Sequence, residues 1–148
     1  MISIKRVSKS QLAEYVDIAY RGDTDLLEKY HTQKHKSVEG AVFSTMLMID
    51  DASKQLEMKY YKICWRSKPI GYFAVFDKFL YSYGINIKFR SPEIHESWWR
   101  EVKRVLGKGF MSMIYDNNER ALSFLKRNGM VELEHNLENH SILLTCQS

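Results

Sequence analysis

Cysteine is scarce in this sequence of 148 residues, which contains only Cys64 and Cys146. Small secreted proteins that rely on disulfides carry several cysteine pairs, so two distant thiols do not indicate a disulfide framework. Residues 1–6 lack the apolar core of a signal peptide, and no segment has the uninterrupted apolar length needed to cross a membrane. We therefore expect a protein of the reducing cytoplasm with no membrane partner, whose thiols are packing or surface groups.

Motifs that would indicate other functions are also missing. The sequence has no glycine-rich Walker loop, no zinc-finger spacing and no aromatic RNA-binding signature. His31 and His35 lie four residues apart, but no third ligand or acidic partner accompanies them, so we expect no metal site. The net charge of +4 allows an acidic partner. A polyphosphate cofactor would meet that charge as well as a nucleic acid, and nucleic-acid binding, which rests on net charge alone, is not expected.

The length and composition fit one globular domain, residues 1–148. Charged residues make up 27% of the chain and hydrophobic residues 45%, which are ordinary values. A chain of this length buries roughly two thirds of the surface that its unfolded form exposes. A chain of this size therefore needs neither a disulfide nor a metal to hold its fold. No internal repeat or linker divides it into further domains.

Hydrophobic periodicity predicts an alternation of strands and helices. The polar turn at 66–69 joins two apolar runs and predicts an antiparallel hairpin. In chain order we expect a strand at 2–7, a helix from Ser8 or Ser10, amphipathic segments from Asp23 and from Ser37, strands at 56–65, 70–79 and 80–89, a helix from Ser91, a strand at 109–115, a helix at 118–129, and strands at 131–133 and 141–145.

Residues 118–130 carry the signals of a complete helix. Asp116 or Asn117 can cap its first turn, Glu119 places a negative charge near the positive end of the helix dipole, and Gly129 can close the last turn. Because a predicted strand precedes this helix, its first amides point above the sheet, where an anion or a carbonyl group could bind.

The same segment resembles the C-terminal motif of the GNAT superfamily of acyl-CoA N-acyltransferases. In that motif an Asn-x-x-Ala start leads to a Lys or Arg and a final Gly, here Asn118, Ala121, Lys126 and Gly129. The expected order of elements resembles the GNAT fold over nearly the whole chain, and residues 68–73 look like its hairpin. The resemblance implies an α/β (α+β) fold with a mixed, mainly antiparallel sheet flanked by helices. A narrower resemblance is to small divergent members encoded by tailed bacteriophages.

The resemblance also implies a function. Such a protein transfers an acyl group, usually acetyl, from acetyl-CoA to a primary amine of a small molecule or a protein, without a tightly bound cofactor or metal. The pantetheine arm is assigned to the backbone where the fourth and fifth strands splay apart, although these residues can also be plain sheet core. The implied cofactor-binding residues are Ile85, Asn86, Ile87, Arg90, Ser91, Asn118, Phe124 and Lys126.

The loop after the fourth strand departs from the family pattern. The family loop offers bare backbone amides to the pyrophosphate of the cofactor, but Glu93 and His95 stand here at the two glycine positions, and Pro92 removes a donor. Two interpretations stay open. The segment is either a helix start that needs no ligand, or a site where Arg90, Lys88 and His95 replace the lost amides with side-chain charge.

Amine acylation needs a base for the ammonium group and an acid for the departing thiolate. The family often places a tyrosine acid on the last helix, where this chain has Leu125. Tyr115 is the substitute on geometric grounds, with His95 as a weaker one. For the base, Tyr83, His95, Asp77 or a relayed water stay open.

Two further features bear on this function. Tyr81 and Tyr83 are expected on one face of the fourth strand. Trp98 is expected inward on its helix and Trp99 toward the boundary or solvent, where it packs as the cap of a wide apolar face or, alternatively, belongs to a partner surface. A homodimer or a protein partner therefore stays open. The alternative function is a GNAT-fold protein that has lost catalysis and binds another protein, which Pro92, Glu93 and Leu125 favour.

Overall fold

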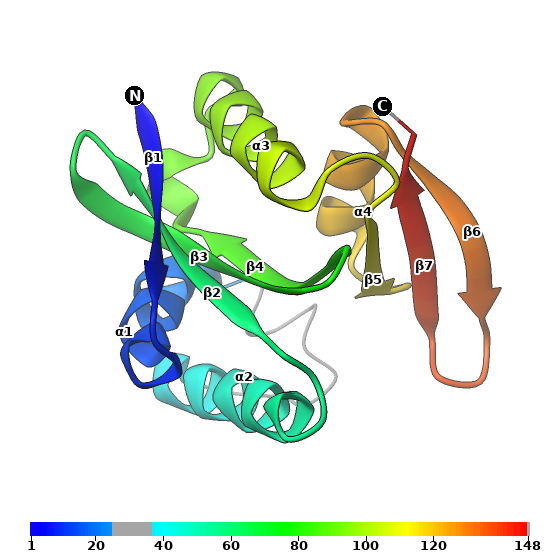
Figure 1. The fold of residues 1–148 in the computed structure, drawn as a ribbon, viewed down its shortest axis with the longest axis horizontal. Helices are drawn as coiled ribbons and strands as arrows, with labels where there is room; N and C mark the ends of the chain where they lie inside the picture. The colour runs from blue at the N-terminus through cyan, green and yellow to red at the C-terminus, as the bar shows by residue number, and fades with distance from the viewer. Residues whose placement is uncertain (25–36, 148) are drawn as a thin grey trace.

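The computed structural model describes residues 1–24 and 37–147, and these form one mixed sheet with helices on both faces (Figure 1). The sheet has the order β1-β2-β3-β4-β5-β7-β6, and all neighbours are antiparallel except β4 and β5. This confirms the expected α/β (α+β) architecture. The elements are β1 (Ile2–Val7), α1 (Lys9–Tyr20), α2 (Val38–Ser53), β2 (Lys59–Trp65), β3 (Lys68–Phe76), β4 (Phe79–Ile85), a 3-10 turn (Ile87–Phe89), α3 (Pro92–Leu106), β5 (Met111–Tyr115), α4 (Glu119–Arg127), β6 (Met130–Asn136) and β7 (Ser141–Cys146).

Some expectations fall on residues outside the described ranges. These are most of the amphipathic segment predicted from Asp23, and the pair His31 and His35. Within residues 1–24 and 37–147, no helix is both long and apolar enough to cross a bilayer. The same ranges hold no group of three histidine, cysteine or acidic side chains placed to bind a metal ion.

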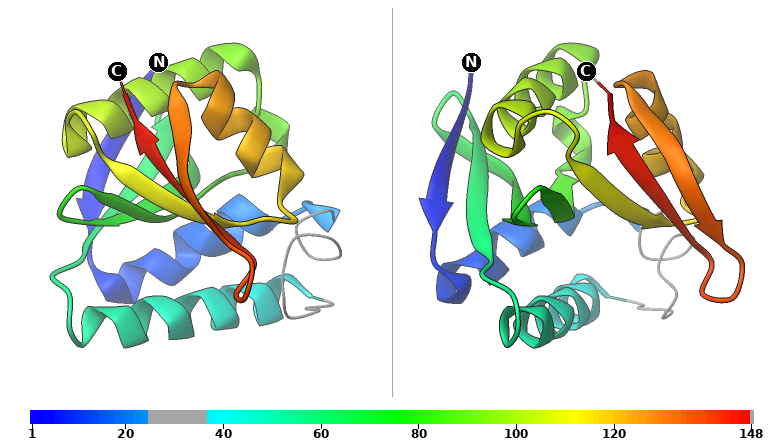
Figure 2. Two further views of the ribbon diagram at one scale, coloured as in Figure 1. Left: turned by 90° about the vertical axis from the view of Figure 1, so that its right-hand side faces the viewer. Right: turned by 45° about the vertical axis from the view of Figure 1, so that its right-hand side comes forward.

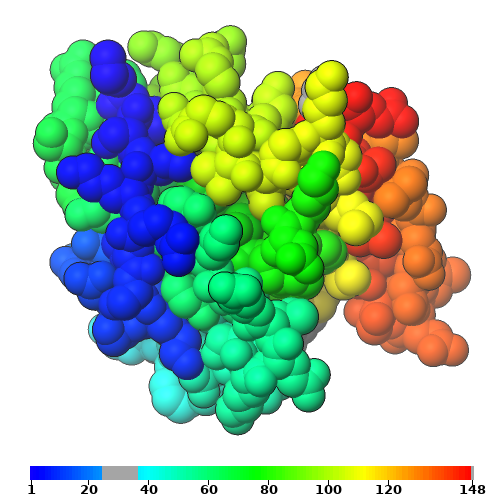
Figure 3. Space-filling view, in the orientation of Figure 1, coloured from blue at the N-terminus to red at the C-terminus, as the bar shows by residue number. Residues whose placement is uncertain are grey.

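Two apolar cores lie on opposite faces of the sheet. Helices α1 and α2 cover one face, and α3 and α4 cover the other (Figure 2). The alternation of side chains along a strand separates the two cores, so that Tyr72 packs under α1 and Phe73 packs under α3, both fully buried. Strand β1 forms one edge of the sheet, and the β6–β7 hairpin forms the other (Figure 3).

Local signals account for most of the element ends. The hairpin between β2 and β3 turns through Arg66 and Ser67, both at positive φ, as a two-residue turn requires. Helix α4 begins one or two residues later than the predicted caps, because Asn118 itself accepts a hydrogen bond from the Ala121 amide at 3.1 Å. The predicted stop at Gly129 is confirmed by its φ of +91°.

Strands β4 and β5 pair at only two positions, Phe79 with Met111 and Leu80 with Ser112, and diverge beyond them. The predicted strand at 80–89 is too long, because β4 ends at Ile85. Asn86 caps the 3-10 turn instead: its side-chain oxygen accepts from the Lys88 amide at 3.0 Å, and its side-chain nitrogen donates to Ile18 O at 2.8 Å. The divergence leaves one edge of β4 without a strand partner.

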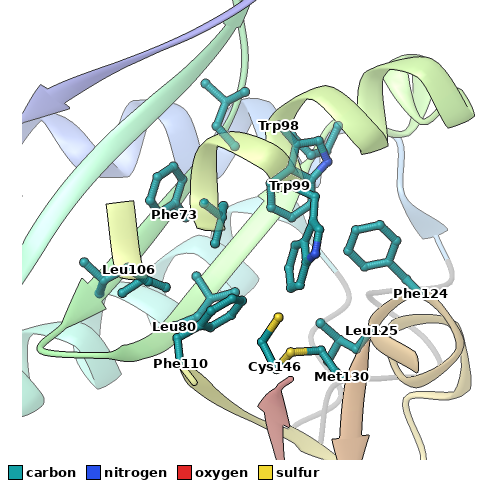
Figure 4. Close-up of a cluster of buried hydrophobic side chains, with 14 of the residues drawn as sticks. Phe73, Leu80, Trp98, Trp99, Leu106, Phe110, Phe124, Leu125, Met130 and Cys146 are labelled. Atoms are coloured by element: carbon teal, nitrogen blue, oxygen red, sulfur yellow. The ribbon is translucent and has the colours of Figure 1, made fainter. Parts of the chain in front are cut away.

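The two adjacent tryptophans are both buried, at 2% exposure each, so Trp99 packs in the core as the packing interpretation predicts, and only its expected position at the boundary is wrong. Trp98 stacks on Phe124 of α4 with ring centres 5.5 Å apart (Figure 4). Trp99 packs against Phe110 and donates from Nε1 to Asn128 O at 3.2 Å. Helix α4 and the segment before β5 cover the Trp99 side chain, so it is not available to a partner.

Candidate functional site

A cavity of about 1010 Å³ opens where β4 and β5 diverge. One wall comes from α2 and the other from α3 and α4, so the cavity reaches both faces of the sheet. This volume is at the upper limit of the range typical of small-molecule sites. Seven of the sequence-predicted site residues line it: Tyr83, Ile85, Arg90, His95, Tyr115, Asn118 and Phe124.

Four predicted cofactor-binding residues do not line this cavity. The side chain of Asn86 is used to hold the end of α1, and Ile87 lies in the 3-10 turn rather than in a strand. Ser91 caps α3 by accepting from the Ile94 amide at 3.3 Å. Lys126 faces β6, where its amine lies 3.5 Å from the Glu132 carboxylate.

The free edge of β4 presents backbone groups to the cavity. The Asn86 amide donates to Ile70 O at 2.8 Å, which makes this pair a hydrogen-bonded one in the antiparallel β3–β4 ladder. Because such pairs alternate along the strand, the amides and carbonyls of Tyr83 and Ile85 point to the opposite edge, toward β5. The Ile85 carbonyl accepts from Arg90 Nε at 2.9 Å, so the Tyr83 groups and the Ile85 amide keep the geometry that pairing with an extended ligand requires.

Tyr81 and Tyr83 do not share a face, and that expectation is wrong. The register between β3 and β4 shifts at Ala74, which pairs with Ser82, whereas Val75 pairs with Leu80. The extra residue in this β-bulge is Tyr81, so its side chain packs with the α1–α2 core while Tyr83 packs with the α3–α4 core. The two phenols therefore line the cavity from different sides of the sheet.

Arg90 is held inside the molecule by a carboxylate that sequence reasoning missed. Its Nη2 lies 2.6 Å from Asp23 Oδ2, and its Nε donates to Ile85 O at 2.9 Å. Asp23 is fully buried and also binds Arg120 of α4, at 2.8 Å. This cluster joins the end of α1, the loop before α3, and α4. Asp23 and Arg120 lie 97 positions apart in the sequence, and no local pattern links them.

Four buried polar atoms have no hydrogen-bond partner within the described residues: Tyr83 Oη, Arg90 Nη1, His95 Nε2 and Trp98 Nε1. All four belong to side chains that line the cavity. Buried polar groups are nearly always paired, so a cluster of unpaired ones marks a place where a ligand can bind. Arginine and tryptophan can only donate, which favours a ligand with acceptor oxygens.

Burial and nearby arginines set the protonation states of His95 and Tyr83 in this part of the cavity. Burial, with smaller effects from Arg90 and Arg127, lowers the pKa of His95 to about 4, so its imidazole is neutral near pH 7. Burial raises the pKa of Tyr83 well above its usual value, and its phenol stays protonated. Tyr83 can therefore donate a hydrogen bond, whereas neither side chain is a strong base.

A chain of hydroxyl groups forms the wall on the α1–α2 side. Tyr20 Oη lies 3.0 Å from Thr45 Oγ1 and 2.9 Å from Tyr72 Oη, and Tyr72 Oη lies 2.7 Å from Ser82 Oγ. Burial raises the pKa of both tyrosines, so the chain is neutral. It fixes β4 to both helices of that face, and the contacts are too distant in sequence to have been predicted.

The outer part of the cavity is mainly apolar and lies between α2 and β5. Leu47 and Met48 of α2 and Met113 of β5 line it and stay substantially exposed. Tyr115, at the end of β5, is 41% exposed and lines the same region. Asp51 is the acidic side chain among the described lining residues there. Asp77, a candidate base, lies in the turn between β3 and β4 and does not line the cavity.

No family model matches this sequence, and no curated protein is similar to it in sequence. Solved structures do share its fold. The PaiA N-acetyltransferase of Thermoplasma acidophilum, in complex with coenzyme A, has a TM-score of 0.69 at 11% identity, with 100% of this chain and 99% of that one covered. An acetyltransferase from Thermus thermophilus has a TM-score of 0.70 at 10% identity, over 98% and 96% of the two chains.

A third similar structure is RimL, the ribosomal L7/L12 α-N-protein acetyltransferase in complex with coenzyme A. Its TM-score is 0.59 at 13% identity, over 97% of this chain and 92% of that one. These likenesses show that the chain has the fold of the GNAT acetyltransferases. None of them supports the narrower resemblance to bacteriophage proteins.

Proposed function

We propose that this protein transfers an acyl group, acetyl in the simplest case, from coenzyme A to a primary amine. The observation that carries the proposal is the cavity between the diverging strands β4 and β5, lined on one side by hydrogen-bond donors that have no partner among the described residues. Two proteins of similar fold were solved with coenzyme A, which supports the choice of donor.

The acyl donor is assigned to the wall formed by β4, α3 and α4. Among the described residues of this wall, Arg90, Arg120 and Arg127 outnumber the buried Asp23, and this excess of positive charge suits an anionic ligand. An extended pantetheine arm fits the free edge of β4, and Phe124 offers it an apolar contact.

The amine is assigned to the opposite part of the cavity, between α2 and β5. The Asp51 carboxylate and the phenols of Tyr81 and Tyr115 line this part, and they suit an ammonium group. The apolar side chains around them would hold the body of the amine and exclude water from the reacting atoms. The acceptor therefore approaches from the face opposite the donor.

A bound acyl-CoA supplies the activated thioester, and the chain supplies hydrogen bonds and a proton. The protonated Tyr83 and the β4 amides are donors for the oxygen that becomes negative during attack. Tyr115 is the candidate acid for the departing sulfur, because Leu125 is fully buried and has no proton to give. The proton of the ammonium leaves through water, since His95 is a weak base at its lowered pKa.

Thiol release from acetyl-CoA in the presence of a panel of primary amines tests this proposal. We expect release that depends on the amine and on the enzyme concentration, with N-acetylated product identified by mass spectrometry. The matched control is Ala121→Trp, which fills the cavity from α4 and should abolish release. If no amine gives thiol release, the result favours the second candidate function, a GNAT-fold protein that binds another protein. The buried Leu125 and the glycine-free start of α3 support that alternative.

A further inference from the structure

The first turn of α3 offers few backbone donors to a phosphate group. Pro92 has no amide hydrogen, and the Ile94 amide donates to Ser91 Oγ at 3.3 Å. The His95 amide donates to Ser91 O at 3.0 Å, in the first bond of the helix. Only the Glu93 amide remains, and its own exposed carboxylate carries the charge that repels phosphate.

Arg90 does not replace these amides at the surface of the loop. Its Nε and Nη2 bind Ile85 O and Asp23, and its Nη1 is buried. That third nitrogen belongs to a side chain that lines the cavity beside β4. The guanidinium thus serves the part of the cavity along β4, where an arm would lie, and not the surface at the start of α3, where a nucleotide would lie.

Among the described residues, the other cations beside the loop are Lys68, Lys88 and Arg127, and all three are exposed. The Lys68 amine lies over the Phe89 ring, 5.4 Å from its centre, and Arg127 is close enough to His95 to lower its pKa. Exposed cations attract a phosphate weakly, and physiological salt screens that attraction. They do not form a pyrophosphate site by themselves.

The part of the cavity along β4, in contrast, offers several hydrogen-bonding groups. The Tyr83 backbone groups and the Ile85 amide face the cavity. Three atoms with no partner among the described residues, Tyr83 Oη, Trp98 Nε1 and Arg90 Nη1, belong to side chains that line it. Acceptor oxygens along an amide-containing arm can pair with these groups in a site that is mostly removed from water. Among the described residues, the groups that can bind the donor are therefore concentrated along the part of the cavity where the pantetheine arm would lie.

We propose that this protein recognises its donor through the pantetheine arm and the thioester, and that the adenosine 3′,5′-bisphosphate end of coenzyme A contributes little to binding. The inference rests on the proposed acyl transfer and narrows it to a class of donor, a thioester of pantetheine with or without its nucleotide.

Calorimetry on the full-length protein with three probes tests the inference: coenzyme A, pantetheine and adenosine 3′,5′-bisphosphate. We expect the Kd values of coenzyme A and pantetheine to agree within about threefold, and no binding of the bisphosphate at millimolar concentration. A coenzyme A affinity more than about thirtyfold above that of pantetheine, or binding of the bisphosphate alone, would overturn the inference and leave acyl transfer standing. Absence of binding by coenzyme A and pantetheine alike would overturn both.

A pair of variants on α3 provides a second readout. Glu93→Gln removes the carboxylate from the first turn, and Glu96→Gln is the matched control one turn later on the exposed side, at 75% exposure. At low salt, Glu93→Gln should tighten coenzyme A binding about two- to fivefold and leave pantetheine binding unchanged. Weaker coenzyme A binding in Glu93→Gln, with Glu96→Gln unchanged, would contradict the inference, because it would make Glu93 part of a working nucleotide site.

Discussion

The carboxylate of Asp23 lies 2.6 Å from the guanidinium of Arg90, although the two residues are 67 positions apart in the chain. The same carboxylate lies 2.8 Å from Arg120, so one buried acid holds two arginines from different elements. This arrangement fixes the loop before α3 against α4 and sets the shape of the wall assigned to the acyl donor. It also explains why Arg90, a candidate phosphate ligand from its sequence position, points inward.

Loss of the Asp23 carboxylate should strongly destabilise the fold. Asp23→Asn leaves two arginines without their buried counter-charge, and we expect the free energy of unfolding to fall by about 3–5 kcal/mol. Chemical denaturation measures this. Asp17→Asn is the control, because Asp17 pairs with the exposed Arg21 one helical turn away, and it should cost below about 1 kcal/mol. Equal effects of the two substitutions would contradict the structural role of Asp23.

The hydroxyl groups of Tyr83 and Tyr72 are both buried, but only that of Tyr72 has hydroxyl partners among the described residues. Tyr83→Phe should therefore leave stability nearly unchanged and lower kcat/KM about tenfold or more, because it removes a donor that faces the cavity. Tyr72→Phe should instead lower the free energy of unfolding by about 1–2 kcal/mol. Thermal denaturation and steady-state kinetics on both variants separate the two roles. A Tyr83→Phe enzyme with full activity would remove this residue from the mechanism.

Tyr115 should act in turnover rather than in the binding of acetyl-CoA. Tyr115→Phe is expected to lower kcat by about ten- to a hundredfold with little change in KM for acetyl-CoA, since it removes the candidate acid. Tyr81→Phe, on the other diverging strand β4, is the control variant. An unchanged kcat in Tyr115→Phe would show that the thiolate takes its proton elsewhere.

His95 should make the fold less stable in acid. Its pKa falls from 6.5 to about 4 on folding, so the unfolded chain binds a proton between these values while the folded chain does not. The free energy of unfolding therefore decreases as the pH falls from about 6.5 to 4, by on the order of 2 kcal/mol from this group. Urea denaturation of the wild type and of His95→Phe at several pH values measures it. If both proteins lose stability equally over this window, His95 is not the cause.

Local sequence signals predicted those parts of the fold that depend on neighbouring residues. Gly129 closes α4 because it can adopt a positive φ, and Ser91 with Pro92 begins α3 as expected. Tyr81 was assigned to the wrong face because a bulge is set by the pairing of two strands, which a single strand does not reveal. The end of β4 was missed for a similar reason, because the Asn86 side chain binds the distant Ile18 carbonyl.

The candidate site was predicted in part. Tyr83, His95 and Phe124 come together because the element order brings β4, α3 and α4 to one place. The Asp23–Arg120 contact joins distant segments, and nothing in either local sequence indicates it. The burial of Trp99 likewise depends on the position of α4, which a helical-wheel argument on α3 alone does not include.

Calorimetric titration of the wild type and of Ala121→Trp with acetyl-CoA tests the central claim most directly, because that claim is an acyl-donor site between β4 and β5. We expect saturable one-to-one binding to the wild type, and a loss of binding in Ala121→Trp with its circular dichroism spectrum unchanged. If the wild type gives no heat and no thermal stabilisation at millimolar acetyl-CoA, the assignment of this cavity as a donor site is contradicted.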